Sequence, residues 1–119
     1  MTRHDDSVRL RDMLDHAVEA VDAAVPRTRK DLDADRFFNL ALVRLVEIVG
    51  EAAAHVSQDT RDRCPNVPWV SVVGLRNRLI HGYDEVDFDI LWDIVRIDFP
   101  NLILELRNVL GQDSGRNRD

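Results

Sequence analysis

The chain has 119 residues, of which 45% are hydrophobic and 32% charged, a balance that predicts one folded domain with a modest core. The formal net charge of −6 and the pI of about 5.1 argue against a protein that coats long duplex DNA through its phosphates. Cys64 is the single cysteine, which excludes an internal disulfide, and no Cys/His cluster has zinc-site spacing. We therefore expect neither a metal nor a cofactor.

The N-terminus is polar and leads into no apolar signal segment. No run of residues approaches the roughly 18 apolar positions that a membrane span needs. These features predict a cytoplasmic protein without membrane contact.

Apolar residues recur at three- and four-residue spacing over residues 6–25, which predicts an amphipathic helix that Pro26 ends. The charged residues 27–33 follow as a linker. A second helix is predicted over residues 34–57, and it is apolar around most of its circumference, as expected for a central or interface helix. Its remaining polar strip is either a solvated edge with ion pairs or a buried strip facing a site; the strip contains Arg44, Glu47, Glu51 and His55.

A third helix is predicted over residues 68–80, with Pro68 in its first turn and Gly82 as its C-terminal glycine. Asp87 is the expected N-cap of a last helix over residues 88–110, which Pro100 should kink or split. Residues 111–119 read as a disordered tail, so the folded domain is placed at residues 1–110.

The last helix carries two apolar faces on nearly opposite sides, one for its own core and one for a second subunit. The chain shows neither an internal repeat nor the alternation of strands. The predicted fold is therefore an all-α, antiparallel bundle of four to five helices.

Helical placement of residues 72–81 puts Arg76 in the middle of an apolar arc, with Asn77 and His81 sharing one flank. A buried guanidinium needs a partner, because an unpaired buried charge is costly. Glu47 or Glu51 of the polar strip is the expected partner, and a bound phosphate is the alternative.

His81 is expected in the last turn of its helix, where the negative end of the dipole favours the imidazolium. An imidazole can act as general base and then as general acid, while Arg76 stabilises charge on a phosphoryl group. Together they can cleave RNA without a metal. Tyr83 can contact substrate or accept a transferred group. From spacing alone, a structural role for these residues in tying down a turn is the simpler interpretation.

The segment matches a known signature: Arg76, four residues, His81, one residue and Tyr83 form the Arg-x(4)-His-x-Tyr pattern of HEPN proteins. The wider chain, from about residue 8 to residue 110, resembles the HepT-like toxin family. The matching stretches, in order, are LVEIVGEAA at residues 45–53, PNVPW at 65–69, GLRNRLIHGY at 74–83, VDFDILW at 86–92 and DFP at 98–100.

This resemblance implies a HEPN-type bundle that forms a homodimer, with the signatures of both subunits lining one cleft. It implies the toxin of a type VII toxin–antitoxin system, an endoribonuclease acting on tRNA or mRNA without a metal. Arg76 and His81 would be catalytic, Asn77 and Arg78 would position substrate, and Tyr83 would accept AMP. The donor would be an MNT-type nucleotidyltransferase antitoxin, and the added charge and bulk would block the cleft.

The acids Asp84, Glu85 and Asp87 lie beside a site expected to bind RNA phosphates, and Arg78 or a second subunit would have to offset them. The alternative is a non-catalytic HEPN subunit that binds a nucleotidyltransferase. A third interpretation, a structural bundle without a partner, leaves the Arg76, Asn77 and His81 cluster unexplained.

Overall fold

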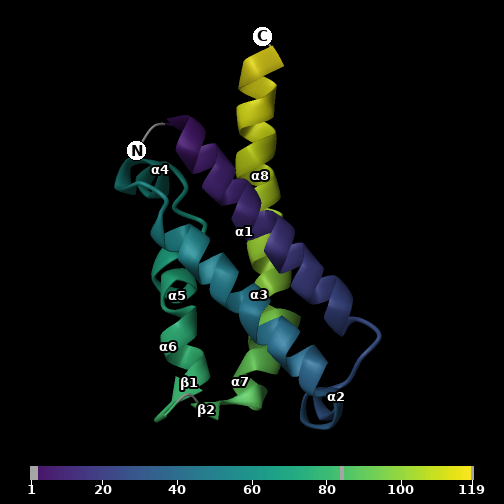
Figure 1. Ribbon diagram of the computed structural model, residues 1–119. Coiled ribbons are helices and arrows are strands. Elements are labelled where there is room, and N and C mark those ends of the chain that lie inside the picture. Colours follow the sequence, from purple (N-terminus) through teal and green to yellow (C-terminus); the bar gives the residue numbers. More distant parts are fainter. Residues whose placement is uncertain (1–2, 84, 119) are drawn as a thin grey trace.

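Three long helical segments cross one another and a shorter fourth segment lies beside them, as the computed structural model of the chain shows (Figure 1). The structure describes residues 3–83 and 85–118, and the side chains of residues 5–83 and 85–111. In chain order the elements are α1 (Arg3–Ala24), α2 (Arg29–Ala34), α3 (Arg36–Ala54), α4 (Gln58–Arg63), α5 (Trp69–Val73), α6 (Leu75–Leu79), β1 (Ile80–His81), β2 (Glu85–Val86), α7 (Phe88–Asp93), the π-helix η1 (Ile94–Asp98) and α8 (Phe99–Arg118).

The predicted all-α bundle is confirmed. Helices α1 and α3 run antiparallel and share the most extensive interface, and α8 packs against α1 (Figure 1). Helices α5 and α6 descend along the other side of α3, so that α3 lies between them and α1. None of the described helices is both long and apolar enough to cross a membrane.

The core forms where the apolar stripes of the three long segments meet, as the helical periodicity predicts. Its fully buried side chains come from α1, α3 and the segment from α7 to α8; among them are Leu10, Met13, Leu42, Val46, Leu91, Phe99 and Leu106. Leu75 and Leu79 of α6 are buried in the same core. The short helix that carries the HEPN signature is therefore anchored on one side by burial.

Helix α5 approaches α3 closely at Gly50, where a Cβ would lie 3.2 Å from the carbonyl oxygen of Val72. A larger side chain at this position would require the two backbones to move apart. Gly50 thus allows α5 and α6 to lie against α3, beside the polar strip of that helix.

The last long helix is interrupted before Pro100, as predicted, and the interruption is a π-helical turn in which the N–H of Phe99 bonds to the carbonyl of Ile94. The extra residue rotates the helix surface, so that both Ile94 and Val95 are buried. The second apolar face was expected to consist of Ile90, Ile94 and Ile97. It does not form a continuous exposed surface, because Ile94 is fully buried whereas Ile97 is exposed.

Three further expectations are corrected. The supposed linker at residues 27–33 contains α2, which is anchored by the fully buried Leu32. The supposed single helix at residues 68–80 is two short helices that meet at Gly74. The chain also forms two short strands, β1 and β2, which pair antiparallel.

Helix α8 runs to Arg118, but the side chains of residues 112–119 lie outside those described. The disordered tail and the domain boundaries therefore stay predictions.

Asp6, near the start of α1, is hydrogen-bonded to the start of α4, and this contact should make the stability of the fold depend on pH. Its buried carboxylate accepts hydrogen bonds from the backbone N–H of Ser57, at 3.0 Å, and from the hydroxyls of Ser57 and Thr60. Burial opposes ionisation, but these hydrogen bonds outweigh it and lower the pKa of Asp6 from its ordinary value.

Asp6→Ala should lower the free energy of unfolding by about 1–3 kcal/mol at pH 7, because charged hydrogen bonds are lost, as urea denaturation would measure. The folded-state pKa is depressed, so this stabilisation is present above the ordinary pKa of 3.8 and is lost as the pH falls through the lowered value. Asp15→Asn, at an exposed position of α1, is the control and should change little. An unchanged difference between wild type and Asp6→Ala from pH 7 to pH 2 would contradict this assignment.

Candidate active site

A small hairpin joins α6 to α7 and carries His81. Ile80 pairs with Val86 and His81 with Glu85, and Gly82 adopts a positive φ of 66° in the turn. The N–H of Asp87 then bonds to the carbonyl of Leu79 at 2.8 Å, which closes the junction between the end of α6 and the start of α7. Glycine suits this turn because residues with a Cβ rarely adopt such a backbone conformation.

Because of this hairpin, the predictions for His81 and Gly82 are wrong. Helix α6 ends at Leu79, so His81 lies on β1 and not in the last turn of a helix, and the expected effect of the helix dipole does not apply there. Gly82 does not end a helix; it makes the hairpin turn. The prediction of Gly82 as a helix C-terminal glycine is therefore wrong, and its positive φ serves the turn between two short strands instead.

Arg76 lies on α6 on the side that faces α3. Its side chain is 68% exposed, so the predicted apolar setting is wrong. Its Nε lies 3.8 Å from Oε2 of Glu47, which is 22% exposed, and this confirms Glu47 as the predicted partner. Glu51 does not share that role, because it pairs with Arg44 at 3.2 Å. The polar strip on α3 is therefore mainly a solvated edge, and Glu47 is the member that meets Arg76.

His81 is oriented by a carboxylate. Its Nε2 lies 3.3 Å from Oδ2 of Asp87, and the imidazole is 60% exposed. When Nε2 carries the proton, Nδ1 presents a lone pair, and the ring can then accept a proton from a substrate. His81 can therefore act as a base whose orientation is fixed by the carboxylate of Asp87.

Asp87 is confirmed as the N-cap of α7, since one carboxylate oxygen accepts from the N–H groups of Asp89 and Ile90 at 3.0 and 3.1 Å. The bond from Ile90 lowers the pKa of Asp87 most, partial burial opposes this, and the bond from Asp89 and the nearby imidazole of His81 add to the lowering. The carboxylate is therefore charged at neutral pH, with its second oxygen turned to His81.

The remaining predicted site residues are distributed around this centre. Asn77 is exposed on α6, and Tyr83 is fully exposed in the hairpin turn. Arg78 pairs with Asp98 of η1 at 3.0 Å, whereas Arg76 pairs with Glu47 of α3. Asp84 lies outside the described residues, and Glu85 is exposed. Among the described residues, no group of three or more metal-ligating side chains comes together.

The contact between Asp87 and His81 is the feature that sequence reasoning missed. Asp87 was recognised as a helix cap but was counted among acids that disfavour RNA. A glycine-containing loop between Ile80 and Val86 was the available signal, since such loops join short antiparallel strands and would bring the two residues together.

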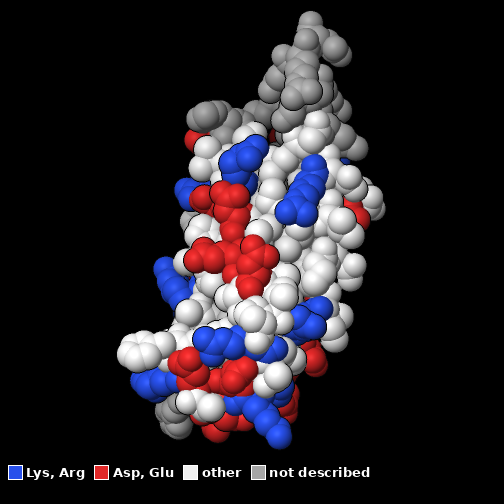
Figure 2. Space-filling model, turned by 90° about the vertical axis from the view of Figure 1, so that its right-hand side faces the viewer, with Lys and Arg blue, Asp and Glu red and all other residues white. Residues whose placement is uncertain are grey.

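Part of the chain's negative charge lies away from this site. Acidic side chains gather over α1 on the side of the molecule away from α5 and α6, shown in Figure 2. The outer face of α1 carries Asp12, Asp15, Glu19 and Asp22. At the site itself, Arg76, Arg78 and His81 each lie beside a carboxylate, so an RNA phosphate would have to compete with Glu47 for Arg76.

An all-helical bundle with an exposed arginine and histidine at a helix–hairpin junction, each beside a carboxylate, defines a HEPN-type protein. The family described as Ribonuclease HepT-like matches residues 8–109, and the chain belongs to this family.

Three relatives illustrate the match. The protein named "Putative RNase MJ1380" of Methanocaldococcus jannaschii is 38% identical over 92% of this chain and 100% of its own length. The "Probable ribonuclease HepT" of Thermococcus cleftensis is 33% identical over 77% of this chain and 87% of its own. "Putative RNase TTE0752" of Caldanaerobacter subterraneus is 28% identical over 87% and 96%. No solved structure matches the chain significantly.

The two roles of Asp87 can be separated by substitution. Asp87→Ser keeps an oxygen that caps α7 but removes the carboxylate beside His81, whereas Asp87→Ala removes both. We expect Asp87→Ala to lower the midpoint of thermal unfolding and Asp87→Ser to change it little. Both variants should lose RNA cleavage to a similar extent. Full cleavage activity of Asp87→Ser at normal stability would show that Asp87 acts only as a helix cap.

Proposed function

We propose that this HepT-like chain is a metal-independent endoribonuclease of the cytoplasm and the toxin of a type VII toxin–antitoxin pair. The observation that carries the proposal is the pair of exposed groups Arg76 and His81, each held near a carboxylate, on the signature of a ribonuclease family. Groups held by neighbours lose less freedom when substrate binds, which favours catalysis.

The reaction follows from the chemistry of the two side chains. His81 takes the proton of a ribose 2′-hydroxyl through its free ring nitrogen, and the 2′-oxygen attacks the adjacent phosphorus. Arg76 donates hydrogen bonds to the phosphoryl oxygens, where negative charge builds up. The bond to the 5′-oxygen breaks, and an imidazolium returns a proton to that oxygen. The products are a 2′,3′-cyclic phosphate and a 5′-hydroxyl. Asn77, exposed on the same short helix, is assigned to positioning the backbone.

A second copy of the chain would complete this site. Arg76 and His81 are more than half exposed, so a single chain does not exclude water from them. Large apolar side chains lie exposed near the polar strip: Phe37 is 85% exposed on the same face of α3 as Arg44 of that strip, and Val70 of α5 is 90% exposed. Burial of these side chains in a homodimer would bring the two signatures to one cleft.

Tyr83 is the proposed site of control by an MNT-type nucleotidyltransferase. Its side chain is fully exposed at the tip of the hairpin, two residues from His81, so a partner enzyme can reach the hydroxyl. The hydroxyl oxygen would attack the α-phosphorus of ATP, its proton would pass to a base, and pyrophosphate would leave. The attached AMP adds a negative phosphate and an adenine beside the imidazole and would repel and obstruct RNA.

Removal of either catalytic side chain tests the ribonuclease activity. We expect Arg76→Ala and His81→Ala each to lower kcat for cleavage of tRNA or mRNA by about 10²–10⁴-fold, as measured with purified protein in the presence of EDTA. Arg107→Ala and His55→Ala are matched controls at exposed positions outside the site and should retain activity.

The non-catalytic alternative predicts a different result. If the chain only binds a nucleotidyltransferase, wild type would cleave no RNA, and His81→Ala would change neither growth nor RNA in cells. Retention of cleavage by His81→Ala would equally contradict the proposed role of the imidazole.

The role of Tyr83 is tested by coexpression with an MNT-type nucleotidyltransferase and intact-mass measurement. Wild type should gain the mass of one or more AMP units and lose RNA cleavage. Tyr83→Phe should gain none and keep cleaving RNA in the presence of the partner, because it lacks the acceptor oxygen. An equal mass gain on Tyr83→Phe would place the modification elsewhere.

A further inference from the structure

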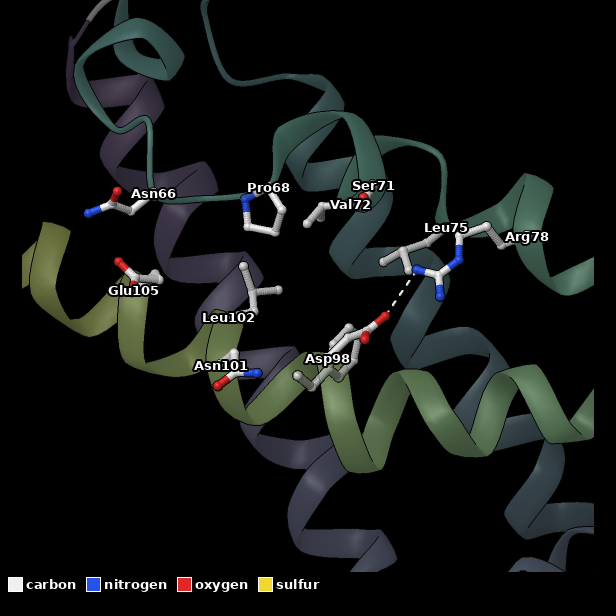
Figure 3. Close-up of a pocket in the computed structure, with 11 residues that line it drawn as sticks. Asn66, Pro68, Ser71, Val72, Leu75, Arg78, Asp98, Asn101, Leu102 and Glu105 are labelled. Atoms are coloured by element: carbon white, nitrogen blue, oxygen red, sulfur yellow. Dashed lines mark hydrogen bonds and ion pairs between the residues drawn. The ribbon is translucent and has the colours of Figure 1, made fainter.

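A groove runs between α5–α6 and η1–α8, on the side of α6 to which Arg78 extends (Figure 3). Its volume is about 510 Å³, within the range of sites that hold small organic molecules. Apolar side chains form part of its lining, and Val72, Leu75 and Leu102 among them are almost completely buried. This lining suits a flat, mostly apolar group.

One end of the groove carries hydrogen-bonding groups that are not used within the chain. Asn66, from the loop before α5, and Glu105, from α8, lie opposite each other there (Figure 3). Ser71 of α5 lines the same groove. Within the described part of the chain, these three side chains form no hydrogen bond or ion pair. An amide, a hydroxyl and a carboxylate are therefore available to a ligand.

The other end is closed by the ion pair between Arg78 and Asp98, whose Nη1 and Oδ2 atoms are 3.0 Å apart (Figure 3). Because this pair neutralises the guanidinium, the remaining charge in the groove is the carboxylate of Glu105. A phosphate is disfavoured beside it, whereas a neutral ring with N–H donors is favoured.

We propose that this groove binds a nucleobase that carries an exocyclic amino group, belonging to the RNA strand that is cleaved; the proposal rests on the proposed ribonuclease function. Glu105 accepts from the amino group, and the amide of Asn66 completes the contact with the neighbouring ring atom. Uracil presents a carbonyl oxygen where cytosine has its amino group, and two acceptors would then face each other without a hydrogen bond.

One end of the groove adjoins the short helix that carries the catalytic residues, and Asn66 and Glu105 lie at the other end (Figure 3). Arg78, which closes one end, is two residues after Arg76, and exposed Asn77 lies between them. An α-helix with its side chains is about 10–12 Å across. A strand with a phosphate at Arg76 that crosses the outer surface of α6 would then run along the groove and could place a base further along the strand at Asn66 and Glu105. Single-stranded RNA is commonly recognised through such splayed bases.

Cytidine and uridine provide a matched pair of probes, since they have the same size and differ in the amino group. We would titrate each into ¹⁵N-labelled full-length wild-type protein and follow the backbone amide signals of Ser71, Asn101 and Leu102. Cytidine should shift them in a saturable manner, and uridine should bind roughly tenfold more weakly. Ribose 5-phosphate should leave them unchanged.

Two pairs of variants connect the binding to the groove. Glu105→Gln should remove the preference for cytidine, whereas Glu19→Gln, on the exposed face of α1, should keep it. Asn101→Phe should fill the groove and abolish binding of both nucleosides; Leu104→Phe, three residues further on α8 at an exposed position outside the groove, should not.

Equal affinity for cytidine and uridine, signal changes outside the groove only, or a preference that survives in Glu105→Gln would overturn the proposal. Nucleosides contain no bond that the enzyme can cleave, so the titration does not depend on activity. A protein that binds cytidine in the groove but cleaves no RNA would overturn the proposed ribonuclease function and leave the nucleobase site standing.

Discussion

The junction between α6, the hairpin and α7 depends on Asp87, and much of the candidate site depends on that junction. Its backbone N–H bonds to the end of α6, one carboxylate oxygen caps α7, and the other oxygen lies against His81. A single residue therefore fixes where one helix ends, where the next begins and how the imidazole is held. The acid that seemed to disfavour RNA binding is the one that orients the proposed base.

The rest of the fold presents this junction to solvent. Buried leucines hold α6 against the core, and the small volume of Gly50 allows α5 to approach α3. Arg76 then meets Glu47 on one side of α6 and Arg78 meets Asp98 on the other. Both arginines are paired with acids at the surface, where such pairs are weak, so an RNA phosphate can compete for Arg76 at little cost.

The sequence was sufficient where a signal was local or periodic. Three- and four-residue spacing predicted the long helices and their buried faces, and Asp87 was recognised as a helix cap. Glu47 was one of the two side chains of the polar strip predicted as the partner of Arg76. The hairpin was missed because its strands are two residues long, too short to show alternation. Arg76 was predicted to be buried because an ideal continuous helix was assumed, whereas the chain breaks at Gly74. The groove could not be predicted, since it joins residues from the α4–α5 loop to residues of α8 that are distant in sequence.

Arg76 and His81 are proposed to cleave RNA by activating a ribose 2′-hydroxyl without a metal. The most direct test is to incubate the unmodified protein with end-labelled RNA in EDTA and to determine the chemical ends of the products. The mechanism predicts 2′,3′-cyclic phosphate and 5′-hydroxyl ends, and no cleavage of an RNA with a 2′-O-methyl group at the cleaved position. Products with 3′-hydroxyl and 5′-phosphate ends, or cleavage that requires a divalent metal, would contradict it.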